Sequence, residues 1–433
     1  MRGFLITRVL VPALAIVFSC SSINTPALAS YVFTSHTFTN CGALGKTGPT
    51  QTACRSSYST SWDESDANFT VTNGIQNWTV PTTGYYYIDA YGAGGYGAYA
   101  GGGARIADTF LLTEGEVIKI LVGQIGETST FVSANSGAGG TFVVRTPYNT
   151  NGSILVIAGG GAGSESGSSQ HAEAHASITT SGNNGYATGG GAPSATTSGS
   201  GGTGGNGGGT AASENAGGGG GGFFTDGTRN TNWDNNGGVA FVTGGAGATG
   251  GTTYANSNDG GFGGGGAAAG KGTGGGAGGG GGYSGGGGGD NIGNGSGGGG
   301  GSYFANGRNT NRITTVNGNP AQTQGFVTIT FLSASTSTAT LTVAGNVTKT
   351  EFNKTVVLTS DVNAPGKVTF FENNRKIPGC IGKSATSTVT CSWKPKIRGS
   401  VKVKAILTPT DNSLTSATSP FLSIDIVSRT TAR

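Results

Sequence analysis

The chain has 433 residues, of which 88 are glycine, while only 10% are charged. Glycine has no strict every-third-residue spacing and only 12 prolines are present, which excludes collagen; the low charge argues against an ordinary disordered segment. The net charge of +4 hides an asymmetry, because residues 30–334 hold 9 Lys/Arg and 15 Asp/Glu (net −6), whereas residues 335–433 hold 13 and 5 (net +8). We therefore predict a domain boundary near Ser333–Ala339.

The N-terminus has the three parts of a secretory signal peptide. A basic end, an apolar core and a small-residue cleavage site are found in Arg2 with Arg8, Val9–Phe18 and Ala27-Leu28-Ala29. We expect residues 1–29 to be removed and the mature protein to be secreted or held at the cell surface. A lipoprotein signal acylated at Cys20 is the alternative. The apolar run is shorter than the roughly 20 residues of a membrane span, so no span is predicted.

Four further cysteines fall into two close pairs that are far apart in the sequence. The natural pairing is Cys41 with Cys54 and Cys380 with Cys391, as local disulfides in an exported protein. Crossed pairings would tie two separate domains together. A zinc site is the competing interpretation, but neither pair has CxxC spacing.

The N-terminal part contains short β-branched and aromatic runs separated by turn residues, without a convincing helical period. The predicted strands begin near Phe38 and continue at Gly74–Pro81, Tyr85–Tyr91, Val117–Val122, Phe142–Arg145, Ile154–Ala158 and, beyond the glycine-rich region, Phe326–Leu332. This pattern indicates an all-β sandwich or jelly roll. If Phe326–Leu332 completes the sheet begun near Phe38, the glycine-rich region, about residues 159–303, is an insertion within one domain.

The insertion contains unbroken glycine runs, at Gly217–Gly222, Gly278–Gly282, Gly285–Gly289 and Gly297–Gly301. Polyglycine adopts an extended threefold helix of about 3.1 Å per residue, and such helices bond laterally to one another. A Cβ pointing inward would block this approach. Aromatic residues punctuate the region, which favours an ordered insertion over a linker; they are Phe223, Phe224, Tyr254, Phe262, Tyr283 and Tyr303.

Several motifs occur between Thr39 and Ile329 in colinear order. They are Thr39-Asn40-Cys41-Gly42-Ala43, Thr47-Gly48-Pro49-Thr50, Cys54 with Tyr58, Gln76-Asn77-Trp78-Thr79-Val80-Pro81 with Gly84-Tyr85-Tyr86, Tyr91–Gly95, Ile120–Glu127, Leu155–Gly161, Gly278–Gly285, Gly299–Phe304 and Gly325–Ile329. The set resembles the glycine-rich domain of the anaplastic lymphoma kinase and leukocyte tyrosine kinase receptors, a domain also found in microbial secreted proteins. The resemblance implies a tumour-necrosis-factor-like jelly-roll sandwich holding polyglycine helices in residues 30–334, and it transfers no ligand contacts.

Residues 335–433 are predicted to form a second, smaller β-sandwich. Its expected strands are Ala339–Val343, Thr355–Leu358, Lys367–Glu372, Thr388–Ser392, Ser400–Leu407 and Phe421–Val427. The segments Val368–Asn374 and Val401–Ala405 resemble strands of bacterial Ig-like repeat domains. Lys402 and Lys404 alternate with valines and so face solvent. This basic face is either the solvated surface of a spacer or a contact for an anionic cell-wall or envelope polymer.

No nucleic-acid partner is predicted, because no aromatic residue interleaves with the lysines and no nucleic-acid motif is present.

The search for chemistry finds no catalytic triad, carboxylate pair or activated cysteine. His171 and His175 are four residues apart, but the Gly/Ser/Thr context is not helical and the order differs from HExxH. We therefore predict no catalysis, metal or cofactor, and a structural, adhesin-like binding protein whose glycine-rich domain presents loops to an extracellular protein or surface glycan. The alternatives are a metal-dependent extracellular enzyme using His171 and His175, and a receptor-like binder of a soluble protein ligand.

Overall fold

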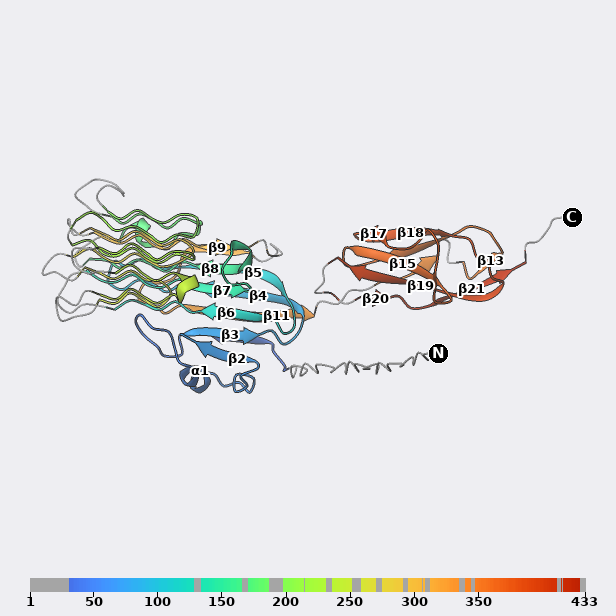
Figure 1. Cartoon of the computed structure of the whole chain (residues 1–433), viewed down its shortest axis with the longest axis horizontal. Helices are drawn as coiled ribbons and strands as arrows, with labels where there is room; N and C mark the ends of the chain where they lie inside the picture. The colour runs from blue at the N-terminus through green and yellow to red at the C-terminus, as the bar shows by residue number, and fades with distance from the viewer. Residues whose placement is uncertain are drawn as a thin grey trace, which may run out of the picture.

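The computed structural model describes residues 31–127, 134–165, 170–186, 198–213, 215–230, 236–250, 258–269, 275–290, 295–305, 307, 312–334, 339–343, 347–410, 414 and 416–428. The predicted signal peptide with Cys20 lies outside this part of the chain, as does Tyr254. Within the described residues, strands up to Ala334 pair only with one another, and so do the strands from Thr342 onward (Figure 1).

Two antiparallel sheets build the N-terminal sandwich. The 5-stranded sheet has the order β1 (Ser35–Phe38), β11 (Phe326–Ala334), β4 (Gly84–Tyr91), β5 (Gly103–Leu112) and β10 (Ile313–Asn319). The 6-stranded sheet has the order β2 (Phe69–Thr72), β3 (Ile75–Thr79), β6 (Val117–Leu121), β7 (Thr141–Arg145), β8 (Ile154–Ala158) and β9 (Tyr303–Phe304). Both sheets contribute to one apolar core, which includes Phe38, Tyr86, Trp78 and Ile120.

The strand that follows the glycine-rich region lies inside the first sheet. β11 pairs with β1 on one side and β4 on the other, with Phe38 opposite Val327 and Ile88 opposite Ile329. The expectation that it completes the sheet begun near Phe38 is confirmed. The glycine-rich region is therefore tied at both ends to one sandwich, leaving after β8 and returning through β9.

The glycine runs follow a threefold pattern of lateral hydrogen bonds. In Gly217–Gly222, donors three residues apart bond to the same neighbouring segment. The bonds are Gly217 to Gly289 and Gly220 to Gly286, Gly218 to Ala267 and Gly221 to Gly264, and Gly219 to Thr228 and Gly222 to Thr225, each from N to O at 2.7–3.0 Å. A repeat of three residues is the period of the extended polyglycine helix, which the sequence predicts for these runs.

Each central run is surrounded by other runs. Gly278–Gly282 exchanges backbone hydrogen bonds with segments that contain Ala138, Gly160, Gly218, Gly266, Gly286 and Gly298. These segments run side by side in Figure 1 and continue the sandwich strands away from the apolar core. The buried peptide groups of this lattice are thus satisfied without a β-sheet or an α-helix.

An aromatic cluster fastens the lattice to the outer face of the 6-stranded sheet. Phe241, in the short 3-10 turn η4 (Phe241–Thr243), stacks on Phe142 of β7 at 5.0 Å between ring centroids and on Phe223 at 5.2 Å. Phe262 and Tyr283 belong to the same buried cluster. The aromatic residues that punctuate the glycine runs are therefore the contacts between lattice and sandwich.

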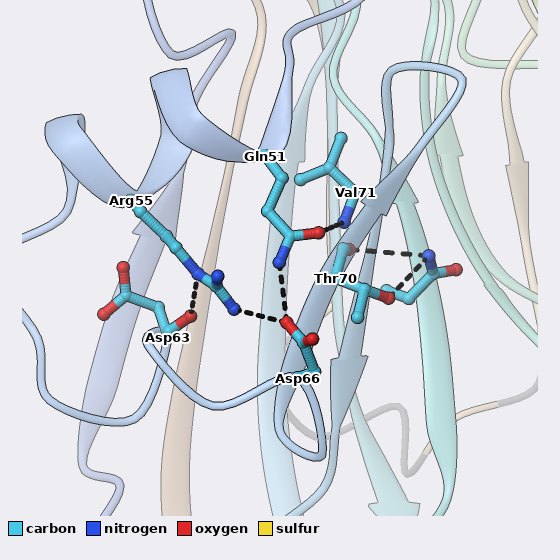
Figure 2. Close-up of polar contacts among 7 residues, drawn as sticks. Gln51, Arg55, Asp63, Asp66, Thr70 and Val71 are labelled. Atoms are coloured by element: carbon cyan, nitrogen blue, oxygen red, sulfur yellow. Dashed lines mark hydrogen bonds and ion pairs between the residues drawn. The ribbon is translucent and has the colours of Figure 1, made fainter.

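A small cap stands on the edge strand β2. It holds the helix α1 (Gln51–Ser57), whose N-terminus is capped by the Thr50 side chain, and the disulfide Cys41–Cys54, with an S–S distance of 2.02 Å. Figure 2 shows how the cap is tied down: Arg55 and Gln51 both donate to Asp66 Oδ1, at 2.7 and 2.8 Å, and Gln51 Oε1 accepts from the backbone N–H of Val71. This helix has no helical period in the sequence and was therefore not predicted.

The C-terminal part forms two sheets around a separate apolar core. The 3-stranded sheet has the order β12 (Thr342–Val343), β14 (Val356–Asp361) and β18 (Thr388–Trp393). The 7-stranded sheet contains β13 (Lys349–Glu351), β21 (Leu422–Val427), β19 (Gly399–Pro409), β15 (Gly366–Glu372) and β16 (Arg375–Lys376), with β17 (Lys383–Ala385) on β15 and β20 (Ala417–Thr418) on β19.

The second disulfide connects the two C-terminal sheets. Cys391 lies on β18, while Cys380 follows β16 and its carbonyl accepts from Phe370 N on β15 at 3.0 Å. The S–S distance is 1.98 Å. Cys380 lies in a turn because Pro378 and Gly379 (φ +79°) end the preceding strand.

Candidate binding surface

The two histidines of the metal hypothesis have separate partners. The His171 ring stacks on Tyr186 with 3.7 Å between centroids, and His175 Nδ1 accepts a hydrogen bond from Gly102 N at 2.9 Å. Burial lowers the pKa of His175, which favours the neutral imidazole that accepts this hydrogen bond. The turn between them, η2 (Ala172–Ala174), is a 3-10 helix, so the spacing of four residues does not place them on one α-helical face.

The described residues offer no assembled metal centre. No group of three or more His, Cys, Asp or Glu side chains in this part of the chain is placed to hold a metal ion. None of the helices among the described residues is long and apolar enough to cross a membrane.

Lysine and phenylalanine side chains meet on the outer face of the C-terminal 7-stranded sheet. Along β19, Val401, Val403 and Ala405 are buried in the core, so the intervening Lys402 and Lys404 point outward. The register places Phe371 of β15 directly opposite Lys404 and also opposite Lys376 of β16. The predicted outward orientation of the two lysines is therefore confirmed.

The lysines lie over aromatic rings. Lys404 Nζ is 5.6 Å from the centroid of Phe371 and 5.0 Å from that of Phe421, and Lys402 Nζ is 5.9 Å from Phe421. Such cation–π contacts leave the ammonium donors free for a further partner. Phe421 is 51% exposed, so its ring offers apolar surface beside the two ammonium groups. We call Phe371, Lys376, Lys402, Lys404 and Phe421 the basic–aromatic face.

The positive charge of this face is not neutralised within the sandwich. Among the described residues, neither Lys402 nor Lys404 has an Asp or Glu oxygen within ion-pair distance. The ion pairs found there all involve residues 46–312, in the N-terminal part of the chain. Unpaired surface cations attract polyanions over a range of about 8–10 Å at physiological salt.

No aromatic residue interleaves with the lysines in the sequence, but the fold brings Phe371 and Phe421 beside them. Phe371 lies on a neighbouring strand and Phe421 directly precedes β21, so neither stands near Lys402 or Lys404 in the sequence. The available signal was Phe370-Phe371, in which one ring enters the core and the next must face outward. Only the strand pairing shows which lysine lies opposite it.

Comparison with known proteins gives one partial relation. No family model matches the chain. In an alignment of 100 residues the sequence is 43% identical to the leukocyte tyrosine kinase receptor of Mus musculus. The match covers 21% of this chain and 11% of that receptor's length. This match supports a weak relation to that receptor.

The structural comparison adds no further relation. A solved polysaccharide lyase aligns with 82% of this chain and 43% of its own length, at 8% identity and a TM-score of 0.17. A score this low carries no argument about fold or activity. The likeness of residues 335–433 to bacterial Ig-like repeats stays a prediction.

Proposed function

We propose that the protein is a secreted or cell-surface structural and binding protein without catalysis, held at the cell envelope through its C-terminal sandwich. The observation that carries this proposal is the basic–aromatic face, where lysines without an ion-pair partner stand over the exposed Phe421 and the half-buried Phe371. Its partner is an anionic envelope polymer, which the ammonium groups attract and the rings contact through apolar surface. The two disulfides and the receptor match are compatible with a location outside the cell.

In this proposal the N-terminal part, residues 30–334, is the displayed unit and residues 335–433 are the attachment unit. The lattice supports the proposal, because its glycine runs are hydrogen-bonded to one another on several sides and can serve as a scaffold for the loops of the domain. Presentation of these loops to an extracellular partner is the second half of the proposed function.

The decisive experiment measures binding of the full mature chain to purified envelope polymer by cosedimentation. The Lys402→Met/Lys404→Met variant should bind at least about tenfold more weakly, because methionine keeps the stem and removes the charge. Raising the salt concentration from about 50 mM to about 500 mM should weaken the binding of the wild-type chain to the polymer in the same way, because salt screens the charges.

The matched control is Lys367→Met/Lys383→Met, which removes two charges from β15 and β17 of the same sheet, away from Phe421. It should retain most of the binding. Binding that persists in high salt, or that both double variants weaken equally, would show that the basic–aromatic face is not the contact.

A further inference from the structure

A polar hollow lies where the lattice meets the outer face of the 6-stranded sheet. It has a volume of about 260 Å³. One wall is the β2–β3 hairpin with Thr72 and Asn73, the floor is formed by Asn77 and Lys119, and the other wall is η4 with Val242. Asn77 of β3 and Lys119 of β6 are direct cross-strand neighbours, so their side chains emerge together on this face.

Both walls are built rigidly. The hairpin turns through Asn73 and Gly74, which both have positive φ (49° and 79°), and a Cβ on Gly74 would meet Gly48 and Phe262 within 3.0 Å. On the opposite wall, the backbone N–H groups of Phe241 and Val242 donate to Gly222 and Phe223 of the lattice. The hollow therefore exists before any ligand arrives.

The hollow contains one cation without an anionic partner. Lys119 is half-buried, and the contact seen for its ammonium group is with the ring of Tyr148, at 4.3 Å from the centroid. No Asp or Glu among the described residues pairs with it. The carboxylate of Asp226, on the η4 side, already accepts from Ala240 N at 2.7 Å and Thr243 Oγ1 at 3.3 Å.

Neutral polar groups surround this cation. The Asn77 amide nitrogen donates to Thr70 Oγ1 at 3.2 Å, and its Oδ1 makes no hydrogen bond to the described residues. Asn73, Thr72 and Thr243 add an amide and two hydroxyl groups, while Val242, which is 38% exposed, provides an apolar edge. One positive charge, several hydrogen-bonding groups and one apolar edge fit a ring with one negative charge, several hydroxyls and a C–H face.

We propose that this hollow binds a single uronic-acid residue of an extracellular polysaccharide. The Lys119 ammonium would hold the carboxylate, Asn73 and Asn77 the ring hydroxyls, and Val242 the C–H face of the sugar. The volume lies below the about 300–1,000 Å³ of sites for drug-sized ligands, which limits the occupant to one ring. This site is separate from the basic–aromatic face and does not depend on it.

The test compares methyl glucuronoside with methyl glucoside by isothermal titration calorimetry on the full mature chain. The glucuronoside should bind at least about tenfold more tightly than the neutral glucoside, and Lys119→Met should remove this preference. Val242→Glu, at the exposed edge, should abolish glucuronoside binding by charge repulsion without disturbing the core. Thermal unfolding of both variants verifies that they are folded.

The Lys402→Met/Lys404→Met variant is the matched control, because it loses two charges elsewhere and should bind the glucuronoside as the wild-type chain does. Its loss of envelope binding with intact glucuronoside binding separates the two sites. Equal affinity for the two sugars, no binding of the glucuronoside, or unchanged binding by folded Lys119→Met and Val242→Glu would each overturn the proposal.

Discussion

At the scale of single residues, the runs of the lattice pack so closely that many of their glycines have no room for the methyl group of alanine. An ideal Cβ on Gly220, Gly280 or Gly286 would lie within 3.0 Å of a carbonyl oxygen of a neighbouring run. These oxygens belong to backbone that is hydrogen-bonded on other sides, so it cannot move away cheaply. Glycine is required here by close approach of backbones rather than by an unusual φ angle.

Gly280→Ala should destabilise the protein by about 3 kcal/mol or more, because overpacking displaces Gly160 and the runs bonded to it. Chemical denaturation measures the loss. Gly152→Ala is the control, since this glycine is exposed and its Cβ would meet only Thr150 Oγ1, at 3.9 Å. Equal stability of the two variants would mean that the runs pack less closely than these Cβ distances require.

His36 should make the stability of the fold depend on pH. Its ring lies edge-on to Phe38, Tyr58 and Trp62, at 4.7, 4.4 and 5.0 Å, and burial lowers its pKa to about 4, against a smaller opposing effect of Asp63. In the unfolded chain histidine titrates at about 6.5. The unfolded state therefore gains a proton first, and stability is lost as the pH falls from about 6.5 to 4.

The His36→Gln variant should lose less stability over this pH interval than the wild-type chain, because glutamine takes up no proton. Thermal unfolding at several pH values between 7 and 4 measures the two slopes, and the difference isolates His36 from the carboxylates that titrate in the same range. Parallel slopes would contradict a buried neutral His36.

At the scale of elements, the aromatic cluster under the lattice decides whether lattice and sandwich unfold together. Phe241 is only 4% exposed and is stacked between Phe142 and Phe223. It joins a lattice segment to β7 through apolar contact, since the glycine runs themselves offer no side chains. The cluster is thus the main apolar connection between the two parts.

Phe241→Ala should lower the free energy of unfolding by about 3–5 kcal/mol, the usual cost of removing a buried phenylalanine. Phe421→Ala should leave stability nearly unchanged, because that ring is 51% exposed, yet it should weaken binding to the envelope polymer. Denaturation curves and cosedimentation on both variants test this opposite pair of effects. A stable Phe241→Ala variant would count against the cluster as the connection.

The sequence predicted elements whose pattern is local and missed those whose pattern depends on partners. The strand at Phe326–Leu332 was recognised from its β-branched alternation, and β11 occupies it. In β5, by contrast, Ala107, Asp108 and Thr109 are all buried, so no alternation was visible. The helix α1 is only 7 residues long and is held by its Thr50 cap and the disulfide, which a helical period does not reveal.

The candidate site was predictable to a similar extent. The alternation of Lys402 and Lys404 with valines placed the lysines on the solvent side from sequence alone. The roles of Phe421 and Lys119 could not be predicted, because their partners are distant in the sequence. Phe421 lies beside Lys404, and strand register places Lys119 opposite Asn77. A pattern within one segment carries no information about such neighbours.

At the scale of the whole molecule, the lattice should be the part that exchanges its amide hydrogens most slowly. Every N–H of Gly285–Gly289 donates to a carbonyl of another segment, and these residues are buried. We expect protection in Gly278–Gly289 close to that of the sandwich core, measured by hydrogen exchange with mass spectrometry. The exposed Lys394–Arg398 loop should exchange quickly in the same experiment, and fast exchange throughout the glycine runs would refute an ordered lattice.

The threefold pattern of the lattice also governs how its gene could change length. Gly285 and Gly288 donate to Asn206 and Gly209, and Gly286 and Gly289 donate to Gly280 and Ala277, so each neighbour is met again after three residues. Loss of one codon inside a run would turn every later backbone N–H group of that run toward the wrong neighbouring run. Loss of three codons would leave these N–H groups pointing at their original neighbours. Insertions and deletions within the runs should therefore survive in multiples of three codons.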